Sequence, residues 1–281
     1  MSATLIRPRR RRLRAAVTAL LLVAATAAAV PEAVAAPHAA APLPTVVLVH
    51  GAWADTGSWS DVIARLQRDG YTVDAFATPL QRLGTDSQAL ADYLATIAGP
   101  IVLVGHSYGG AVITDAATGN PNVKALVYID AFAPAEGEAI GGLTGAGSVL
   151  VTHDSSELFI PVPLAPPTAT TELYLQPDAF VSYIANDLPA KKARTLAATQ
   201  RPLEYGALGD ASSAPAWASI PSWYEVGTLD QVITPQSQLD MAHRAGSTVV
   251  EARTGHLPMV SDPGAVTRTV EAAAAGTEAR S

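Results

Sequence analysis

A serine in the sequence Gly-His-Ser-Tyr-Gly, at residues 105–109, places the strongest constraint on the fold. The run before it, Ile101–Val104, is short and wholly apolar, as in a buried strand of a parallel sheet, and Ala111–Ala117 follows with helical character. On a sharp turn from strand to helix the serine backbone is strained, and flanking glycines relieve clashes with neighbouring elements. The motif therefore predicts Ser107 as a nucleophile that projects above the strand ends.

Strands and helices are expected to alternate along the rest of the chain. Strands are predicted at Thr45–Val49, Tyr71–Phe76, Ile101–Val104, Val123–Ile129, Trp223–Val226 and Thr248–Glu251. Helices are predicted at Ser58–Arg68, Asp86–Ile97, Ala111–Ala117, Pro235–Arg244 and Pro263–Ala275. This alternation implies right-handed crossovers and an α/β fold with a mostly parallel, doubly wound sheet.

The alternation stops between about residues 133 and 219. Prolines, glycines and polar residues there interrupt helical segments such as Pro177–Ile184 and Pro189–Thr199. We interpret residues 133–219 as a helical cap inserted over the sheet, within one domain that spans residues 45–281.

The first 35 residues have the pattern of a signal peptide. Six arginines lie within the first fourteen residues, followed by the apolar run Ala15–Val30 and the small-x-small sequence Ala33-Val34-Ala35. A membrane anchor is the alternative, but the run is short for the ~20 residues of a span and rich in weakly hydrophobic alanine. We expect a secreted or extracytoplasmic protein without stable membrane association after cleavage, with residues 36–44 as a flexible lead-in. Export by either the general or the twin-arginine route fits the pattern.

The composition excludes several functional classes. Hydrophobic residues make up 49% of the chain and charged residues 15%, which is typical of a large buried core. The net charge is −7 despite the arginine-rich leader, so nucleic acid is not expected as a partner. The absence of cysteine excludes disulfides, thiolate metal sites and a cysteine nucleophile. No H-E-x-x-H pattern occurs, and we predict neither a metal nor a cofactor. We make no prediction of the oligomeric state.

His256 is the best candidate for the base that a serine nucleophile needs. It lies in the loop after the last predicted strand, at the carboxyl end of the sheet where parallel sheets present functional groups. His50, directly after the first predicted strand, and His106, next to Ser107, also adjoin the predicted site. Packing and hydrogen bonding at these positions account for both histidines without a catalytic role.

A carboxylate is needed to fix the tautomer of the histidine and to stabilise its cation. Asp230 follows the second-last strand and lies between Ser107 and His256 in the chain. Asp130 is the alternative, because it also follows a predicted strand. We favour Asp230, with Asp130 otherwise a strand-end or pocket residue.

Two backbone N–H groups are expected to stabilise the oxyanion of the tetrahedral intermediate. One belongs to Tyr108, the residue after the nucleophile. For the other we choose Ala52, in the loop after the first strand, because a small residue there lets the main chain approach closely.

Three segments together resemble the α/β-hydrolase superfamily, and within it the plant methylesterase and hydroxynitrile lyase branch. They are Leu-Val-His-Gly-Ala-Trp at 48–53, Val-Gly-His-Ser-Tyr-Gly-Gly at 104–110 and Gly-His-Leu-Pro-Met at 255–259. The resemblance, which covers about residues 45–275, implies cofactor-free cleavage of a small-molecule carboxylic ester through an acyl-serine intermediate.

The chain departs from the hydroxynitrile lyases at two positions. Those enzymes carry a threonine and a lysine where this chain has Gly51 and Leu257. These differences favour an esterase over a hydroxynitrile lyase. Two alternatives remain open at this point. One is a lactone, amide or C–C bond hydrolase with the same three residues, and the other is a non-catalytic ligand-binding protein on the same fold.

Overall fold

The computed structural model of the protein describes Met1, residues 43–165 and residues 170–278. The predicted signal peptide and most of the lead-in therefore lie outside the described residues. Within the described part of the chain, no helix has both the length and the apolar character that crossing a membrane requires.

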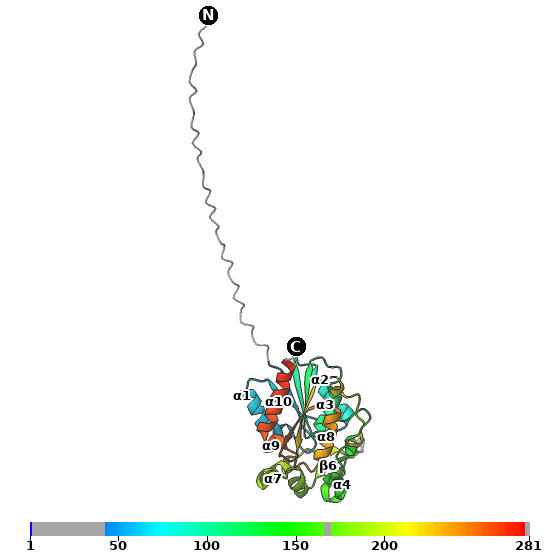
Figure 1. Ribbon diagram of the computed structural model, residues 1–281. Helices are drawn as coiled ribbons and strands as arrows, with labels where there is room; N and C mark the ends of the chain where they lie inside the picture. The colour runs from blue at the N-terminus through cyan, green and yellow to red at the C-terminus, as the bar shows by residue number, and fades with distance from the viewer. Residues whose placement is uncertain (2–42, 166–169, 279–281) are drawn as a thin grey trace. The chain divides into compact units, whose positions relative to one another are not determined.

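Six parallel strands form the central sheet (Figure 1). They are β1 (Thr45–Val49), β2 (Val73–Phe76), β3 (Ile101–His106), β4 (Val123–Ile129), β8 (Ser222–Gly227) and β9 (Thr248–Ala252). Their order across the sheet is β2-β1-β3-β4-β8-β9, and every neighbouring pair is parallel. Every residue of β3 and β8 is buried, as expected for central strands of a parallel sheet that helices cover on both faces.

Helices cover both faces of this sheet. Helices α1 (Ser60–Arg68) and α10 (Pro263–Glu278) lie on one face. On the other face lie α2 (Leu83–Leu94), α3 (Tyr108–Ala116) and α8 (Pro235–Arg244) (Figure 1). The prediction of an α/β fold with a doubly wound parallel sheet is confirmed.

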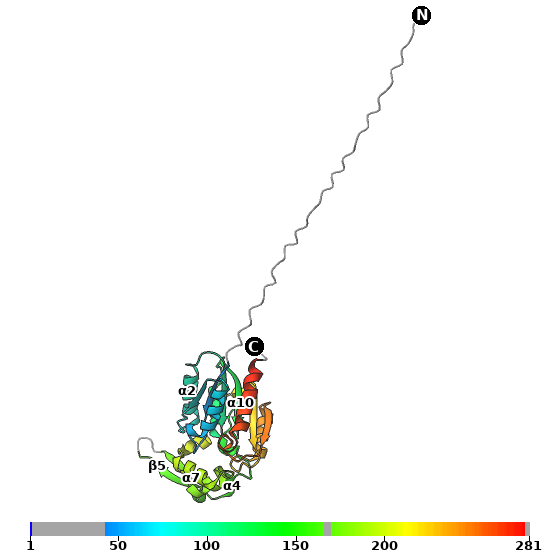
Figure 2. The same cartoon turned by 90° about the vertical axis from the view of Figure 1, so that its left-hand side faces the viewer.

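The region between β4 and β8 contains short helices and a second sheet. The helices are α4 (Val149–Thr152), α5 (Ser155–Leu158), α6 (Pro177–Ala179) with the π-helical turn Phe180–Ile184, and α7 (Ala190–Thr199). The strands are β5 (Phe159–Pro163), β6 (Thr171–Leu175) and β7 (Leu203–Glu204), which form an antiparallel sheet. The labelled elements of this region, α4, β5 and α7, lie at one end of the central sheet, away from the C-terminus (Figure 2).

This second sheet was not predicted, because we expected a helical cap. Pro161 and Pro163 stand in β5 and argue against a strand when the sequence is read alone. The structure places β5 at the edge of its sheet, which is the position that tolerates proline because one side of the strand needs no partner. We call β5, β6 and β7 the cap sheet.

Candidate active site

Ser107 occupies a strained turn between β3 and α3. Its backbone angles, φ 51° and ψ −123°, lie outside the ordinary regions for a residue with a side chain, and Ser107 is buried. A Cβ atom at Gly105 would lie 2.6 Å from the carbonyl oxygen of Gly109, and one at Gly109 would lie 2.6 Å from that of Val49. The two glycines therefore allow the turn to fit between β3, α3 and the end of β1.

The side chains of Ser107, His256 and Asp230 form one hydrogen-bonded row. His256 Nε2 lies 3.0 Å from Ser107 Oγ, and His256 Nδ1 lies 2.8 Å from Asp230 Oδ2. Asp230 follows β8 and His256 follows β9, so three separate strand ends bring the groups together. All three residues are nearly inaccessible to water. Through these hydrogen bonds a proton can pass from the hydroxyl to the imidazole while the carboxylate stabilises the cation.

Asp230 is held by several donors besides His256. Its Oδ1 accepts hydrogen bonds from the N–H groups of Val232, at 2.7 Å, and Ile233, at 3.1 Å. Its Oδ2 accepts a hydrogen bond of 2.8 Å from Nε2 of Gln238 on α8. Gln238 was not among the residues predicted for the site, and the sequence signal for it is weak: a polar residue on an otherwise buried helix face.

Asp130, the alternative acid, lies at the end of β4 and makes a different contact. Its Oδ1 accepts the backbone N–H of Gly227 at 2.5 Å, and its backbone has φ 42°. Burial, together with the charges of Asp230 and Glu225, raises the pKa of Asp130 well above its usual value. The geometry thus places Asp230, not Asp130, beside His256.

His50 and His106 support the main chain around the site. Nε2 of His106 donates to the carbonyl of His256 at 2.7 Å, and burial lowers the pKa of His106 well below its usual value. Nδ1 of His50 donates to the carbonyl of Gly51 at 2.9 Å, and Nε2 accepts the N–H of Thr78 at 3.1 Å. Burial lowers the pKa of His50 to about 4, so both rings are neutral at neutral pH.

Ala52 and Tyr108, the predicted oxyanion donors, both line the cavity at Ser107. The first loop lies against the nucleophile, since a Cβ atom at Gly51 would approach Ser107 Cβ to 2.6 Å. Tyr108 is the first residue of α3, where backbone N–H groups have no acceptor within the helix. Its phenol hydroxyl donates to Asp86 Oδ2 at 2.9 Å and so anchors the ring to α2.

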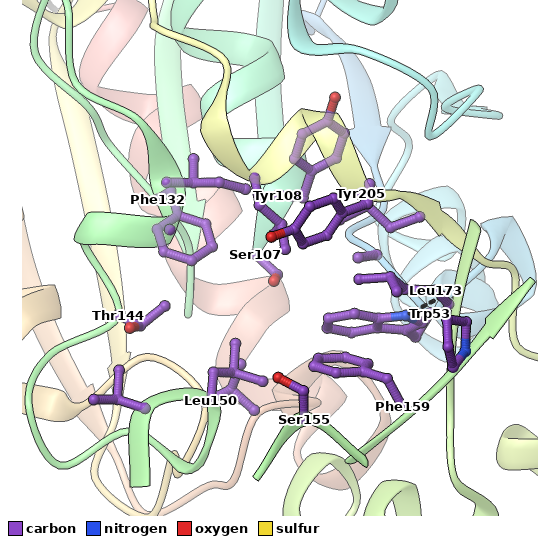
Figure 3. A pocket seen from close by; sticks show the side chains of 18 of the residues that line it. Trp53, Ser107, Tyr108, Phe132, Thr144, Leu150, Ser155, Phe159, Leu173 and Tyr205 are labelled. Atoms are coloured by element: carbon purple, nitrogen blue, oxygen red, sulfur yellow. Dashed lines mark hydrogen bonds between the residues drawn. The ribbon is translucent and has the colours of Figure 1, made fainter. Parts of the chain in front are cut away.

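The cavity above Ser107 has a volume of about 490 Å³ and is mostly apolar. Figure 3 shows the Ser107 hydroxyl facing into it, with Phe132, Thr144 and Leu150 on one side and Trp53, Phe159 and Tyr205 on the other. Its lining includes serine, threonine and tyrosine residues, and none of the described lining residues is charged. Nor do the described residues contain a group of three His, Asp or Glu side chains placed to hold a metal ion. The cavity therefore suits an uncharged molecule with substantial apolar surface.

One curated relative and many solved structures are similar to this chain. A "Carbendazim hydrolyzing esterase" from Nocardioides sp. (strain SG-4G) is 34% identical over 113 residues, a match that covers 34% of this chain. The matched part spans about half of that relative's length, 46%. Polyneuridine aldehyde esterase superposes with a TM-score of 0.70 at 18% identity, covering 82% of this chain and 98% of its own.

A pyrethroid hydrolase from Sphingobium faniae JZ-2 superposes with a TM-score of 0.68 at 22% identity, covering 82% of this chain and 97% of its own. At these identities the superpositions establish a shared fold. The model of the alpha/beta hydrolase family matches residues 46–269, a range that includes Ser107, Asp230 and His256. This chain therefore belongs to the α/β hydrolase family.

Proposed function

We propose that the protein is a serine hydrolase that cleaves carboxylic esters through an acyl-serine intermediate. The observation that carries this proposal is the buried row from Ser107 Oγ through His256 to Asp230, with spacings of 3.0 and 2.8 Å. A hydroxyl alone is a weak nucleophile at neutral pH, and the adjacent imidazole can accept its proton as attack begins.

In the proposed first half-reaction, Ser107 Oγ attacks the ester carbonyl carbon and its proton passes to His256 Nε2. The N–H groups of Ala52 and Tyr108 donate to the oxyanion of the tetrahedral intermediate. The bond to the alcohol oxygen then breaks, and His256 returns the proton to that oxygen. The products of this step are the free alcohol and an ester of Ser107 with the substrate's acyl group.

Water completes the cycle. His256 removes one proton from a water molecule, whose oxygen attacks the acyl-serine carbonyl, and the same two N–H groups hold the second oxyanion. Collapse breaks the bond to Ser107 Oγ and returns the proton to it, which releases the carboxylic acid. Asp230 keeps its charge throughout, which stabilises the imidazolium each time it forms.

The proposed substrates are uncharged esters with a bulky apolar part. The cavity of about 490 Å³ has aromatic walls from Trp53, Phe132 and Phe159, and no charged residue lines it in the part of the chain that the structure describes. A charged acyl group would lose its hydration there without finding an ionic partner. The similar proteins are named as a carbendazim-hydrolysing esterase, a polyneuridine aldehyde esterase and a pyrethroid hydrolase, which supports ester cleavage here as well.

The test compares wild-type protein with Ser107→Ala on p-nitrophenyl butyrate. Loss of the nucleophile should lower kcat by several orders of magnitude. Ser60→Ala is the matched control: the Ser60 hydroxyl donates to the Gly57 carbonyl at the exposed start of α1, and its removal should leave the rate unchanged. Equal rates for wild type and Ser107→Ala would refute the proposal.

We also infer that the chain is exported and loses residues 1–35. The basic first segment, the apolar run and the small-x-small sequence at residues 33–35 support this inference. Expression of the full chain in a bacterial host, with N-terminal sequencing of protein from the medium or periplasm, should give a mature end near Ala36. Protein that stays in the cytoplasm with its first residues intact would contradict it.

A further inference from the structure

Trp53, the residue after the proposed oxyanion donor Ala52, adopts an unusual backbone conformation. Its φ is 56°, in the left-handed region that bulky side chains rarely occupy. A residue remains there only when its surroundings hold it, and such residues gather at functional sites. Trp53 is also buried and lines the cavity at Ser107, so its surroundings bear directly on the site.

Three contacts hold Trp53, and all three come from the cap sheet or the residues leading into it. Its indole Nε1 donates to the carbonyl of Leu173 on β6 at 2.8 Å (Figure 3). Its ring lies against Phe159 of β5, with centroids 5.6 Å apart. Its backbone N–H donates to the carbonyl of Arg201, two residues before β7, at 3.1 Å.

The peptide group that carries the Ala52 N–H is fixed from its other side as well. This peptide joins Gly51 to Ala52, and its carbonyl oxygen accepts the hydrogen bond of 2.9 Å from His50 Nδ1. In a trans peptide the N–H points away from the carbonyl, so a fixed carbonyl also fixes the direction of the N–H. His50 thus holds this peptide, and the contacts of Trp53 hold the next one.

We propose that Trp53 is a positioning residue that ties the oxyanion loop, residues 50–53, to the cap sheet. The hydrogen bond from its indole to Leu173 keeps the loop in the strained conformation that presents the Ala52 N–H beside Ser107. A displacement of β5 and β6 would move Trp53 and weaken oxyanion binding, even with Ser107, His256 and Asp230 in place. This inference rests on the proposed function, because it gives the Ala52 N–H a role in that reaction.

The test uses Trp53→Phe, which keeps an aromatic ring in the cavity but removes the indole N–H. An oxyanion donor acts mainly in the transition state, so kcat for p-nitrophenyl butyrate should fall about tenfold while KM stays within about twofold. Trp217→Phe is the matched control: its indole Nε1 donates to the Pro134 carbonyl at 2.9 Å, and Trp217 does not line the cavity. Its kcat should stay within about twofold of wild type. An unchanged kcat in Trp53→Phe, or an equal loss in Trp217→Phe, would overturn the proposal.

A second replacement covers the case in which Trp53→Phe fails to fold. Benzothienylalanine at position 53 retains the bicyclic shape and replaces the N–H by sulfur, so it should lower kcat to a similar extent. A wild-type rate in this variant would also overturn the proposal.

A fluorophosphonate probe separates this inference from the proposed function. Ser107 Oγ displaces fluoride from phosphorus, its proton passes to His256, and the phosphoryl oxygen occupies the oxyanion site. Labelling of Trp53→Phe should be about tenfold slower than labelling of wild type or Trp217→Phe. If wild-type protein is labelled but cleaves no ester, the proposed function fails and the labelling ratio still decides the role of Trp53. Inertness of the wild-type protein to both reagents would overturn both.

Discussion

Gln238 donates its side-chain N–H to Asp230 Oδ2, the same oxygen that bonds His256 Nδ1, and each of the two contacts measures 2.8 Å. Gln238 is completely buried on α8 and also donates to the carbonyl of Ile233 at 2.9 Å. One amide thus links the start of α8 to the carboxylate that orients the histidine.

Replacing Gln238 by Leu should lower kcat about tenfold, because Asp230 loses a charge-assisted hydrogen bond that fixes its orientation. Gln236→Leu on the same helix is the control: Gln236 bonds Asp240 at the surface, at 2.9 Å, and its loss should leave kcat unchanged. Steady-state kinetics on both variants, with thermal melts to confirm folding, provide the measurement. Equal kcat values in the two variants would remove Gln238 from the site.

The two candidate acids should respond differently to the same change. Asp230→Asn replaces the acceptor of the His256 Nδ1–H and should lower kcat on the order of 10⁴-fold, because the imidazole then takes the wrong tautomer. Asp130→Asn should keep kcat within a few-fold, since an amide oxygen can still accept the Gly227 N–H and asparagine tolerates φ 42°. A larger loss in Asp130→Asn than in Asp230→Asn would reverse the assignment of the acid.

Glu225 should make the protein less stable as the pH rises. Glu225 is buried on β8, and the hydroxyl of Thr269 on α10 donates to its Oε2 at 2.5 Å. Burial raises the pKa of Glu225 from 4.5 to about 7. Between these two values the folded protein retains a proton that the unfolded chain has released, so the free energy of unfolding falls as the pH rises. The total effect is on the order of 3 kcal/mol, complete somewhat above pH 7.

Urea unfolding at a series of pH values from 5 to 9 measures this dependence. Glu225→Gln mimics the protonated form and should flatten the slope over this range, with its largest gain over wild type at the alkaline end. A variant whose stability follows the wild-type curve in parallel would show that Glu225 does not cause the slope.

Gly51→Ala should impair the site although it adds only one methyl group. Its Cβ would lie 2.6 Å from Ser107 Cβ and 2.9 Å from the carbonyl oxygen of His106, so the oxyanion loop or the serine turn has to move. A displacement near 1 Å at reacting groups can cost about 10²-fold in rate, and we expect a loss of that order in kcat/KM.

Gly84→Ala is the control for this substitution, because nothing lies within 4 Å of a Cβ there and the residue is part of α2. It should stabilise the protein by about 0.5–1 kcal/mol and leave activity unchanged. Retention of full activity in Gly51→Ala would mean that the first loop does not need its close approach to Ser107.

Much of the fold could be predicted because burial leaves a clear pattern in the sequence. The strands Thr45–Val49 and Val123–Ile129 begin and end where their apolar runs do. Helix Pro235–Arg244 has the predicted bounds, since proline favours the first turn and Gly246 follows its end in a left-handed conformation. The cap sheet was missed because its strands are short, contain prolines and pair across stretches of chain that no local pattern connects.

The candidate site, like the fold, could be predicted only in part. Ser107 stands in a motif, and His256 and Asp230 follow strands in a recognisable order, so the sequence could place three side chains that the structure brings together. The contact of Gln238 with Asp230 could not be predicted, nor could that of Trp53 with Leu173. Trp53 and Leu173 are 120 residues apart, and their hydrogen bond depends on how a cap strand lies over the first loop.

The position of β9 at the edge of the central sheet has a consequence for how the protein loses and gains activity. This strand, which leads to His256, has one neighbour, β8, and several of its residues are exposed. Edge elements with few contacts open at a smaller free-energy cost than the whole domain. Mild heating or low denaturant should therefore abolish turnover while most of the sheet is still folded, and a newly made chain stays inactive until its last strand has joined.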